Sequence, residues 1–519
     1  MRHFNTAGPC KPELHYMLPS AARLPEARRL IEQQGYFVLH APRQSGKTTV
    51  LQELAQELTA SGRYVAVLVS VETGSAFNAK PDMAEQTILA NWQASVAARL
   101  PAELQPAANI WRSDAAAGAR LRLTLQAWAR TAPHPLVVFI DEIDSLQDEL
   151  LAATLRQLRD GYADRPAGFP WSLALIGLRD VRDYKIASGG SERLNTASPF
   201  NIKMRSLTLG NFTAEEVAAL YSQHTTETGQ LFTAEAVAGA FQLTQGQPYL
   251  VNAVAKVAVE EISPDTARSI EAAHIEEAKD ILIQRQETHL DSLAARLHEP
   301  RVRAVIEPLL AGQGIQHELP EEDIRFVVEL GLARYDQFGR LAIANPIYGE
   351  VIPRVLTTTT RAFLPRIQPI WLNDEGILLV DKLLEAFLLF WRQHGAALLN
   401  TVSYPEIAPH LVLMAFLDRV ANGGGSVTRE YAVGEDYLDL CLRYGAERVA
   451  LELKVWRTGA ANPLKPGLEQ LEKYLEGMSL ATGWLVIFDQ RKKSKRVKKE
   501  PHTALETTPG GKPVTVIYT

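Results

Sequence analysis

Cysteine is almost absent from this chain, in which Cys10 and Cys441 are the only two cysteines among 519 residues. Two cysteines so far apart exclude a disulfide framework and a cysteine-based zinc site. The sequence also has no run near the roughly 18 apolar residues of a membrane-spanning helix. Its first residues are polar or proline, where a secretion signal is apolar. We therefore expect a cytoplasmic protein with no membrane partner.

An excess of positive charge is lacking as well, because 54 Lys and Arg are balanced by 60 Asp and Glu. The formal net charge of −6 means that no general positive field attracts nucleic acid, so any DNA binding must come from local patches. Apolar residues are abundant at 46% of the chain. This length and composition predict about three domains. The strand and helix patterns of the motifs below give the expected fold class, an α/β multidomain protein.

A phosphate-binding loop is predicted where the sequence APRQSGKTT follows the apolar run 36–40 and precedes a stretch with helical apolar spacing. In such a loop, backbone N–H groups and the helix N-terminus bind phosphate. Lys47 would reach the β- and γ-phosphates, and Thr48 would ligate Mg²⁺. The loop has Ala41 where glycine is usual. Its candidate ATP-binding residues are Ala41, Arg43, Gln44, Ser45, Gly46, Lys47, Thr48 and Thr49.

The second half of a nucleotide site is predicted at residues 136–144, LVVFIDEID. This apolar run ends in acids, at the edge of the sheet where ligands bind in open α/β folds. Asp141 would hold Mg²⁺ through its water shell, and Glu142 would polarise the attacking water. A buried strand followed by a solvated acidic turn is the alternative, but the loop and the acidic strand together favour ATP binding.

Two arginines are candidates for contacting the γ-phosphate. A third strand, at 171–180, would bring Arg179 to the same edge of the sheet as a phosphate sensor. Arg193 would reach the site of a neighbouring subunit as an arginine finger, which implies a homo-oligomer formed through this domain. For either residue, the alternative is a surface ion pair worth less than about 1 kcal/mol.

Several motifs within residues 1–260 together resemble the AAA-like ATPases of bacteria, relatives of the origin-recognition and STAND-type proteins. These motifs are FNTAGPCKPELHYMLP, HAPRQSGKTT, IDEID, SERLNTASPFNIK and LTQGQPYLVNAVA. The resemblance implies an AAA+-like parallel sheet with a helical lid. It places His15, Tyr16 and Pro19 near the adenine, and Pro248 at the start of a lid helix beside the nucleotide. No arginine follows Pro248, so a fast hydrolase and a slow nucleotide switch are both open.

Residues 261–360 are expected to form a winged-helix-like domain, because a helix and two short apolar runs joined by QFGR follow one another near its end. This order resembles the module that follows the ATPase in origin-recognition-type proteins. DNA binding through it is one interpretation and a packing or lid role is the other, since the hairpin sets Asp336 beside its arginines. The threonine-rich segment 356–369 is predicted to be a linker, and a helical linker is expected over the overlapping range 361–395.

A separate domain is expected at 396–519, where three short strands follow a helix. In the third strand Glu452 and Lys454 share one face, and Asp439 of the preceding strand can point to the same face. The two carboxylates suit Mg²⁺, with Mn²⁺ as an alternative, and Lys454 would orient or deprotonate a water and stabilise phosphate charge. For Glu-x-Lys alone, a salt-bridged edge strand is the alternative interpretation.

The order Asp, then Glu-x-Lys, resembles the PD-(D/E)XK nuclease superfamily across residues 400–490. The resemblance implies a restriction-endonuclease-like α/β/α core that closes with the strand GWLVIFD. It assigns Glu406 as a helical acid that assists the metal, and Gln470 and Tyr474 as supports of the substrate and active site. The basic run at 491–499 is either a solvated loop or a strip that follows a phosphate backbone.

The two resemblances together predict an ATP-regulated, metal-dependent nuclease that hydrolyses the phosphodiester bonds of DNA. By analogy alone, this pairing suggests defence against foreign DNA or genome maintenance. Two alternatives stay open. One is a signalling or scaffold ATPase whose nuclease-like domain only binds nucleic acid or a partner, and the other is a DNA-loading motor of the AAA+ class.

Overall fold

The computed structural model describes most of the chain. The described residues are 1–111, 115–178, 202–285, 296–310, 319–363, 370–373, 375–395, 399, 407–421, 425–433, 436–491 and 501–519, with backbone alone in 358–363, 428–433 and 436–438. Three predicted site residues, Arg179, Arg193 and Glu406, lie outside these ranges. Of the basic run at 491–499, only Arg491 lies within them.

The chain divides into two compact units. The first unit comprises Met1–Gln284 with Arg325–Leu332, and the second comprises Arg285–Ile324 with Ala333–Thr519. Each unit contains its own large sheet with a hydrophobic core on both faces. No helix in the described part of the chain is long and apolar enough to cross a membrane.

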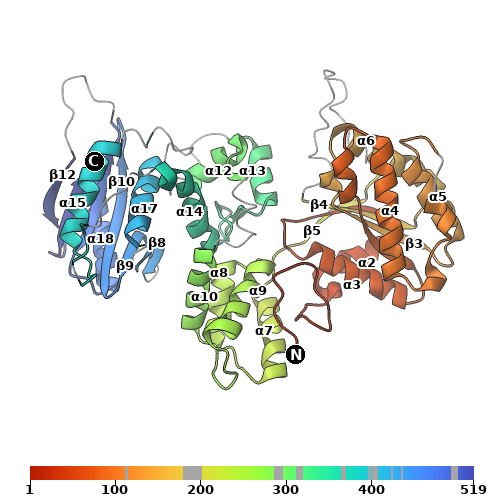
Figure 1. Cartoon of the computed structure of the whole chain (residues 1–519), viewed down its shortest axis with the longest axis horizontal. Helices are drawn as coiled ribbons and strands as arrows, with labels where there is room; N and C mark the ends of the chain where they lie inside the picture. The colour runs from red at the N-terminus through yellow and green to blue at the C-terminus, as the bar shows by residue number, and fades with distance from the viewer. Residues whose placement is uncertain are drawn as a thin grey trace. The chain divides into compact units, whose positions relative to one another are not determined.

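The first unit is built on a five-stranded parallel sheet in the order β2-β3-β4-β1-β5. The strands are β1 (Tyr36–His40), β2 (Val65–Ser70), β3 (Leu136–Asp141), β4 (Ser172–Gly177) and β5 (Arg205–Thr208). The central strands are continuous apolar runs because helices cover both faces. One face packs on α2 (Pro25–Glu32) and α3 (Lys47–Ala60), and the other on α4 (Pro81–Arg99), α5 (Arg120–Thr131) and α6 (Asp148–Gly161) (Figure 1).

A helical lid follows this sheet. It consists of α7 (Ala214–Thr228), α8 (Ala234–Thr244), α9 (Pro248–Val257) and α10 (Ala272–Arg285). Gly246 precedes α9 with φ +70°, and a Cβ there would lie 1.9 Å from the carbonyl oxygen of Phe212, so only glycine fits. Pro248 is the first residue of α9, and the Gln247 side chain accepts a hydrogen bond from Leu250 N at 2.6 Å. These contacts fix the start of α9.

In chain order, the next elements are α12 (Pro300–Leu310), α13 (Glu321–Glu329), β6 (Ala333–Tyr335), β7 (Leu341–Ile343) and α14 (Pro346–Phe363). β6 and β7 pair antiparallel, so the expected order of helix, strand, turn and strand is present. Its winged-helix role stays a prediction. The structure places residues 356–363 of the predicted linker in α14, while the predicted domain boundaries stay a prediction. Burial of apolar residues such as Val351 and Leu356 stabilises this helix despite the low helix propensity of threonine.

The second unit contains a six-stranded sheet in the order β12-β13-β11-β10-β9-β8. The strands are β8 (Gly425–Val433), β9 (Asp436–Tyr444), β10 (Glu447–Trp456), β11 (Gly483–Asp489), β12 (His502–Thr507) and β13 (Pro513–Tyr518). One face packs on α15 (Val380–Phe390) and α17 (Ala408–Ala421), and the other on α18 (Leu464–Gly477). The expectation that β11 closes this core is wrong, because β13 pairs with β11 and β12 pairs with β13.

Candidate functional site

The phosphate-binding loop connects β1 to α3. Gly46 caps α3 with φ +86°, a left-handed conformation that suits glycine. The Lys47 Nζ donates hydrogen bonds to two carbonyl oxygens of its own loop, Ala41 O at 2.8 Å and Pro42 O at 2.9 Å. Burial lowers the pKa of Lys47, while the nearby acids, Asp141 first, oppose this shift. The ammonium group therefore has protein acceptors where phosphate oxygens would bind.

The acid at the end of β3, Asp141, meets the start of α3. Thr48 Oγ1 donates a hydrogen bond to Asp141 Oδ2 at 2.9 Å, and Glu142 N donates to Asp141 Oδ1 at the same distance. Asp141 is buried, which raises its pKa, and the hydrogen bonds from Thr48 and from the Glu142 backbone oppose that rise. A hydroxyl and a carboxylate in contact are the oxygen ligands that Mg²⁺ uses beside a phosphate. The pair therefore fits the expected ion.

Glu142 has a left-handed backbone with φ +57° and is half-buried. Burial, and then the charges of Asp141 and Asp144, raise the pKa of Glu142 to about 7. A carboxyl group with a pKa near neutrality can exchange a proton with water, as a general base must. This environment suits the role expected of Glu142 with the attacking water.

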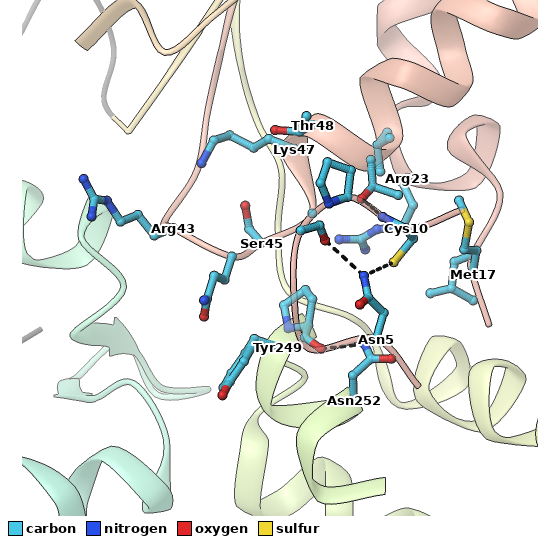
Figure 2. A pocket seen from close by; sticks show the side chains of 18 of the residues that line it. Asn5, Cys10, Met17, Arg23, Arg43, Ser45, Lys47, Thr48, Tyr249 and Asn252 are labelled. Atoms are coloured by element: carbon cyan, nitrogen blue, oxygen red, sulfur yellow. Dashed lines mark hydrogen bonds between the residues drawn. The ribbon is translucent and has the colours of Figure 1, made fainter. Parts of the chain in front are cut away.

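A cavity of about 470 Å³ lies against this loop. Figure 2 shows side chains of the loop, the N-terminal segment and α9 gathered around it. The predicted residues that line it are Arg43, Gln44, Ser45, Gly46, Lys47, Thr48, Thr49, Glu142 and Pro248. Of the three residues expected near the adenine, Tyr16 lines the cavity, whereas His15 and Pro19 are not among its described lining residues.

Other lining residues were missed from the sequence. Asn5 Nδ2 donates to Cys10 Sγ at 3.4 Å, and Cys10 N donates to Thr49 Oγ1 at 3.0 Å, so the N-terminal segment is tied to the loop. Tyr249 and Asn252 of α9 also line the cavity (Figure 2). The signals for these residues were two of the quoted motifs, FNTAGPC for Asn5 and Cys10 and LTQGQPYLVNAVA for Tyr249 and Asn252, but neither motif alone indicated contact with the nucleotide.

Residues 24–166 match the family described as AAA ATPase domain. This match supports an AAA-type P-loop ATPase in this region. The chain is similar in structure to a Walker-type ATPase of Pyrococcus abyssi, with 11% identity, TM-score 0.48 and coverage of 67% of this chain and 98% of that one. It is also similar to the RuvB Holliday junction branch migration motor of Thermotoga maritima, with 14% identity, TM-score 0.34 and coverage of 62% and 90%. No curated protein matches the sequence.

Outside the ATPase domain, a second candidate site lies where β9 and β10 stop pairing. Their antiparallel ladder runs from Glu447 opposite Tyr444 to Leu451 opposite Leu440. In this register Asp439 lies one position further, opposite Glu452. Its Oδ2 accepts a hydrogen bond from Leu453 N at 2.8 Å, in place of a backbone partner. The strands therefore part where the two acids meet.

The predicted base joins the acids on this face. Lys454 Nζ lies 2.5 Å from Glu452 Oε1 and 2.9 Å from Gln470 Oε1. Gln470 Nε2 donates to the hydroxyl of Tyr474 at 2.9 Å, within α18. The structure thus brings together five of the six residues predicted for this site, and Glu406 is the sixth.

Glu452 is the most deeply buried member, with 0% of its surface exposed. Burial raises its pKa, the Asp439 charge adds to the rise, and Lys454 opposes it. Its second oxygen, Oε2, is buried and accepts no hydrogen bond from the described residues. A buried carboxylate oxygen without a partner is costly unless a cation or a donor satisfies it.

A divalent ion fits this donor set. Within the described ranges, no group of three or more His, Cys, Asp or Glu is arranged to hold a metal. Mg²⁺, however, is commonly held by one or two carboxylates together with water and substrate phosphate. Asp439 and the open oxygen of Glu452 supply that number of carboxylates.

Proposed function

We propose that this chain is an ATP-regulated, metal-dependent nuclease that hydrolyses phosphodiester bonds of DNA, in defence against foreign DNA or in genome maintenance. The observation that carries the proposal is the convergence of Asp439, Glu452 and Lys454 on one sheet face, where a buried Glu452 oxygen without a hydrogen-bond donor lies near the Asp439 carboxyl. Structural ion pairs seldom leave a buried carboxylate oxygen unsatisfied, whereas metal sites use such an oxygen.

In this proposal each side chain has one task. Asp439 and Glu452 hold the metal, and a bound Mg²⁺ or Mn²⁺ would stabilise phosphate charge and lower the pKa of a water. Lys454 is about a quarter exposed, so its ammonium group can contact a water or a phosphate oxygen. Gln470 holds that ammonium group in place, and Tyr474 fixes Gln470 in turn.

The regulatory half rests on the ATPase domain. Lys47 and the loop N–H groups would bind the phosphates, Thr48 and Asp141 would hold Mg²⁺, and Glu142 would receive the proton of the attacking water. Arg193 would complete the site of a neighbouring subunit in a homo-oligomer. DNA is the partner as substrate or regulator.

The test compares two lysine variants of the full chain on linear and circular DNA, with Mg²⁺ or Mn²⁺ and with or without ATP. Lys454→Ala should reduce cutting at least about 100-fold, the size of a lost acid–base or electrostatic contribution. Lys465→Ala is the matched control, because Lys465 is 86% exposed on the neighbouring helix and should cut like the wild type. Cutting that survives in Lys454→Ala would refute the proposed site.

A second candidate function is favoured by the ion pair between Lys454 and Glu452, which compensates the charge of the Glu452 carboxylate in part without a metal. In that case the domain binds DNA or a partner and cuts nothing with any metal. The same assay separates the two candidates when DNA binding is measured alongside cutting.

A further inference from the structure

The guanidinium group of an arginine lies over a tryptophan ring at the end of β10, the strand that carries Glu452 and Lys454. The Arg491 Cζ lies 3.5 Å from the centre of the Trp456 ring. Trp456 is the last residue of β10, and its Nε1 donates to Ala460 O at 3.1 Å, which fixes the indole. Asp489, the last residue of β11, is the parallel partner of Trp456 and binds Arg491.

This stack lies on the sheet face of the proposed site. Glu452, Lys454 and Trp456 alternate along β10 with residues of the opposite core, so all three side chains are on the α18 side. Two residues of a strand span about 7 Å, so Trp456 follows Lys454 at roughly the length of one nucleotide.

The guanidinium group of Arg491 is planar, and its positive charge is already paired. Arg491 Nε and Nη2 bind the two oxygens of Asp489, each at 2.8 Å, in a bidentate ion pair. That charge is already compensated by a carboxylate only 10% exposed, so attraction for a phosphate is weak. The side chain of Arg491 is nevertheless 39% exposed. A flat guanidinium over an aromatic ring is a surface on which a nucleobase stacks.

We propose that Trp456 and Arg491 form a platform for an unpaired nucleobase, so that the substrate is DNA with a single-stranded region or a frayed end. The inference rests on the proposed function and names its substrate class. Inside a duplex both faces of a base are occupied by neighbouring bases, whereas an unpaired base can stack on a protein plane.

The alternative is a purely structural role, in which this pair only stabilises the end of β11. Arg491→Lys distinguishes the two roles, because lysine keeps the positive charge and can keep a contact with Asp489 but loses the plane. Arg448→Lys is the matched control, since Arg448 is exposed near the start of β10, the strand that ends at Trp456.

The experiment measures binding of a single-stranded oligonucleotide that contains 2-aminopurine, and of its duplex, by the full chain in EDTA so that nothing is cut. Stacking should quench the 2-aminopurine fluorescence in wild type and in Arg448→Lys. Arg491→Lys should abolish the quenching and weaken single-strand binding by about 5-fold to about 150-fold, with duplex binding unchanged. If Arg491→Lys does not fold, Trp456→Leu removes the ring and should give the same loss.

Equal loss of single-strand and duplex binding, or unchanged quenching in Arg491→Lys, would overturn the platform. These outcomes are independent of cutting, which is judged by Lys454→Ala in Mg²⁺. A chain that cuts nothing, yet loses its single-strand preference in Arg491→Lys, retains the platform and refutes the nuclease. A chain that cuts duplex and single strand alike, with no effect of Arg491→Lys, retains the nuclease and refutes the platform.

Discussion

Glu142 lies half-buried beside two other acids, in a backbone conformation that few residues other than glycine adopt. Its unfolded pKa is 4.5 and its folded pKa is about 7. As pH rises through this interval, the unfolded chain has released the proton while the folded chain still binds it. Stability therefore falls across the interval, and the penalty is fully present above pH 7.

Glu142→Gln should consequently raise stability and remove hydrolysis at once. We expect a gain on the order of 1 kcal/mol at pH 8 and a smaller gain at pH 5, after allowance for the solvent screening of this half-exposed group. ATP turnover should fall at least about 100-fold while ATP binding persists. Urea unfolding at both pH values and an ATPase assay check this. Equal stability of variant and wild type at pH 8 would contradict it.

Tyr474 contributes to the proposed cutting site through one hydroxyl group. Tyr474→Phe keeps the buried ring and removes the acceptor that holds Gln470. We expect unfolding free energy to change by about 1 kcal/mol or less and cutting to fall about tenfold, because Lys454 loses its anchored partner. Tyr335→Phe is the control, since Tyr335 is 57% exposed on the β6–β7 hairpin. A parallel loss of stability and cutting would assign Tyr474 a structural role only.

At the scale of elements, local patterns predicted β9 and β10 well. The turns near 434 and 445 and the alternation of Glu452 and Lys454 with leucines indicated three strands and a polar face. Alternation cannot reveal where a ladder ends, however, so the parting of the strands at Asp439 came only from the structure.

Asp439 ends that ladder with its carboxylate, which allows its structural and chemical roles to be separated. Asp439→Asn retains an oxygen for the Leu453 N–H and should unfold in urea like the wild type, with metal-dependent cutting lost. Asp439→Ala should lose cutting and about 1 kcal/mol of stability. Cutting by Asp439→Asn at the wild-type rate would exclude a metal role for this residue.

The end of α14 and the strands β12 and β13 were not predicted from the sequence patterns, for physical reasons. Threonines favour extended structure, but the burial of apolar residues earlier in α14 stabilises the helix, which continues across the threonines. β12 and β13 follow the basic run in the sequence, and the pairing of β13 with β11 joins strands that are far apart in the chain. Local propensity contains no information on either outcome.

At the scale of the whole molecule, the ATP cavity joins segments that are far apart in the chain. Asn5, Thr49 and Asn252 all line it, although more than 200 residues separate the first from the last. The phosphate loop and the acids after β3 were predictable because each is a contiguous motif. The remaining wall depends on how the lid packs on the sheet, which no single stretch encodes.

The proposed coupling of ATP to cutting gives a prediction for the entire chain. Lys47→Ala should abolish ATP binding, leave the ATP-free rate of cutting unchanged and remove any effect of ATP on it. Lys80→Ala, an exposed control in the same unit, should retain all three properties. Binding of a fluorescent ATP analogue and cutting with and without ATP provide the measurements. A persistent ATP effect in Lys47→Ala would show that the nucleotide acts elsewhere.

The two carbonyl acceptors of Lys47 have a consequence for how readily this protein takes up and releases nucleotide. An arriving triphosphate must displace Ala41 O and Pro42 O from the ammonium group, and a departing one leaves them to return. The contribution of Lys47 to the binding free energy is therefore the difference between its interactions with phosphate and its interactions with the two carbonyl oxygens. Such an exchange favours reversible binding of ATP over a site that is permanently occupied by nucleotide.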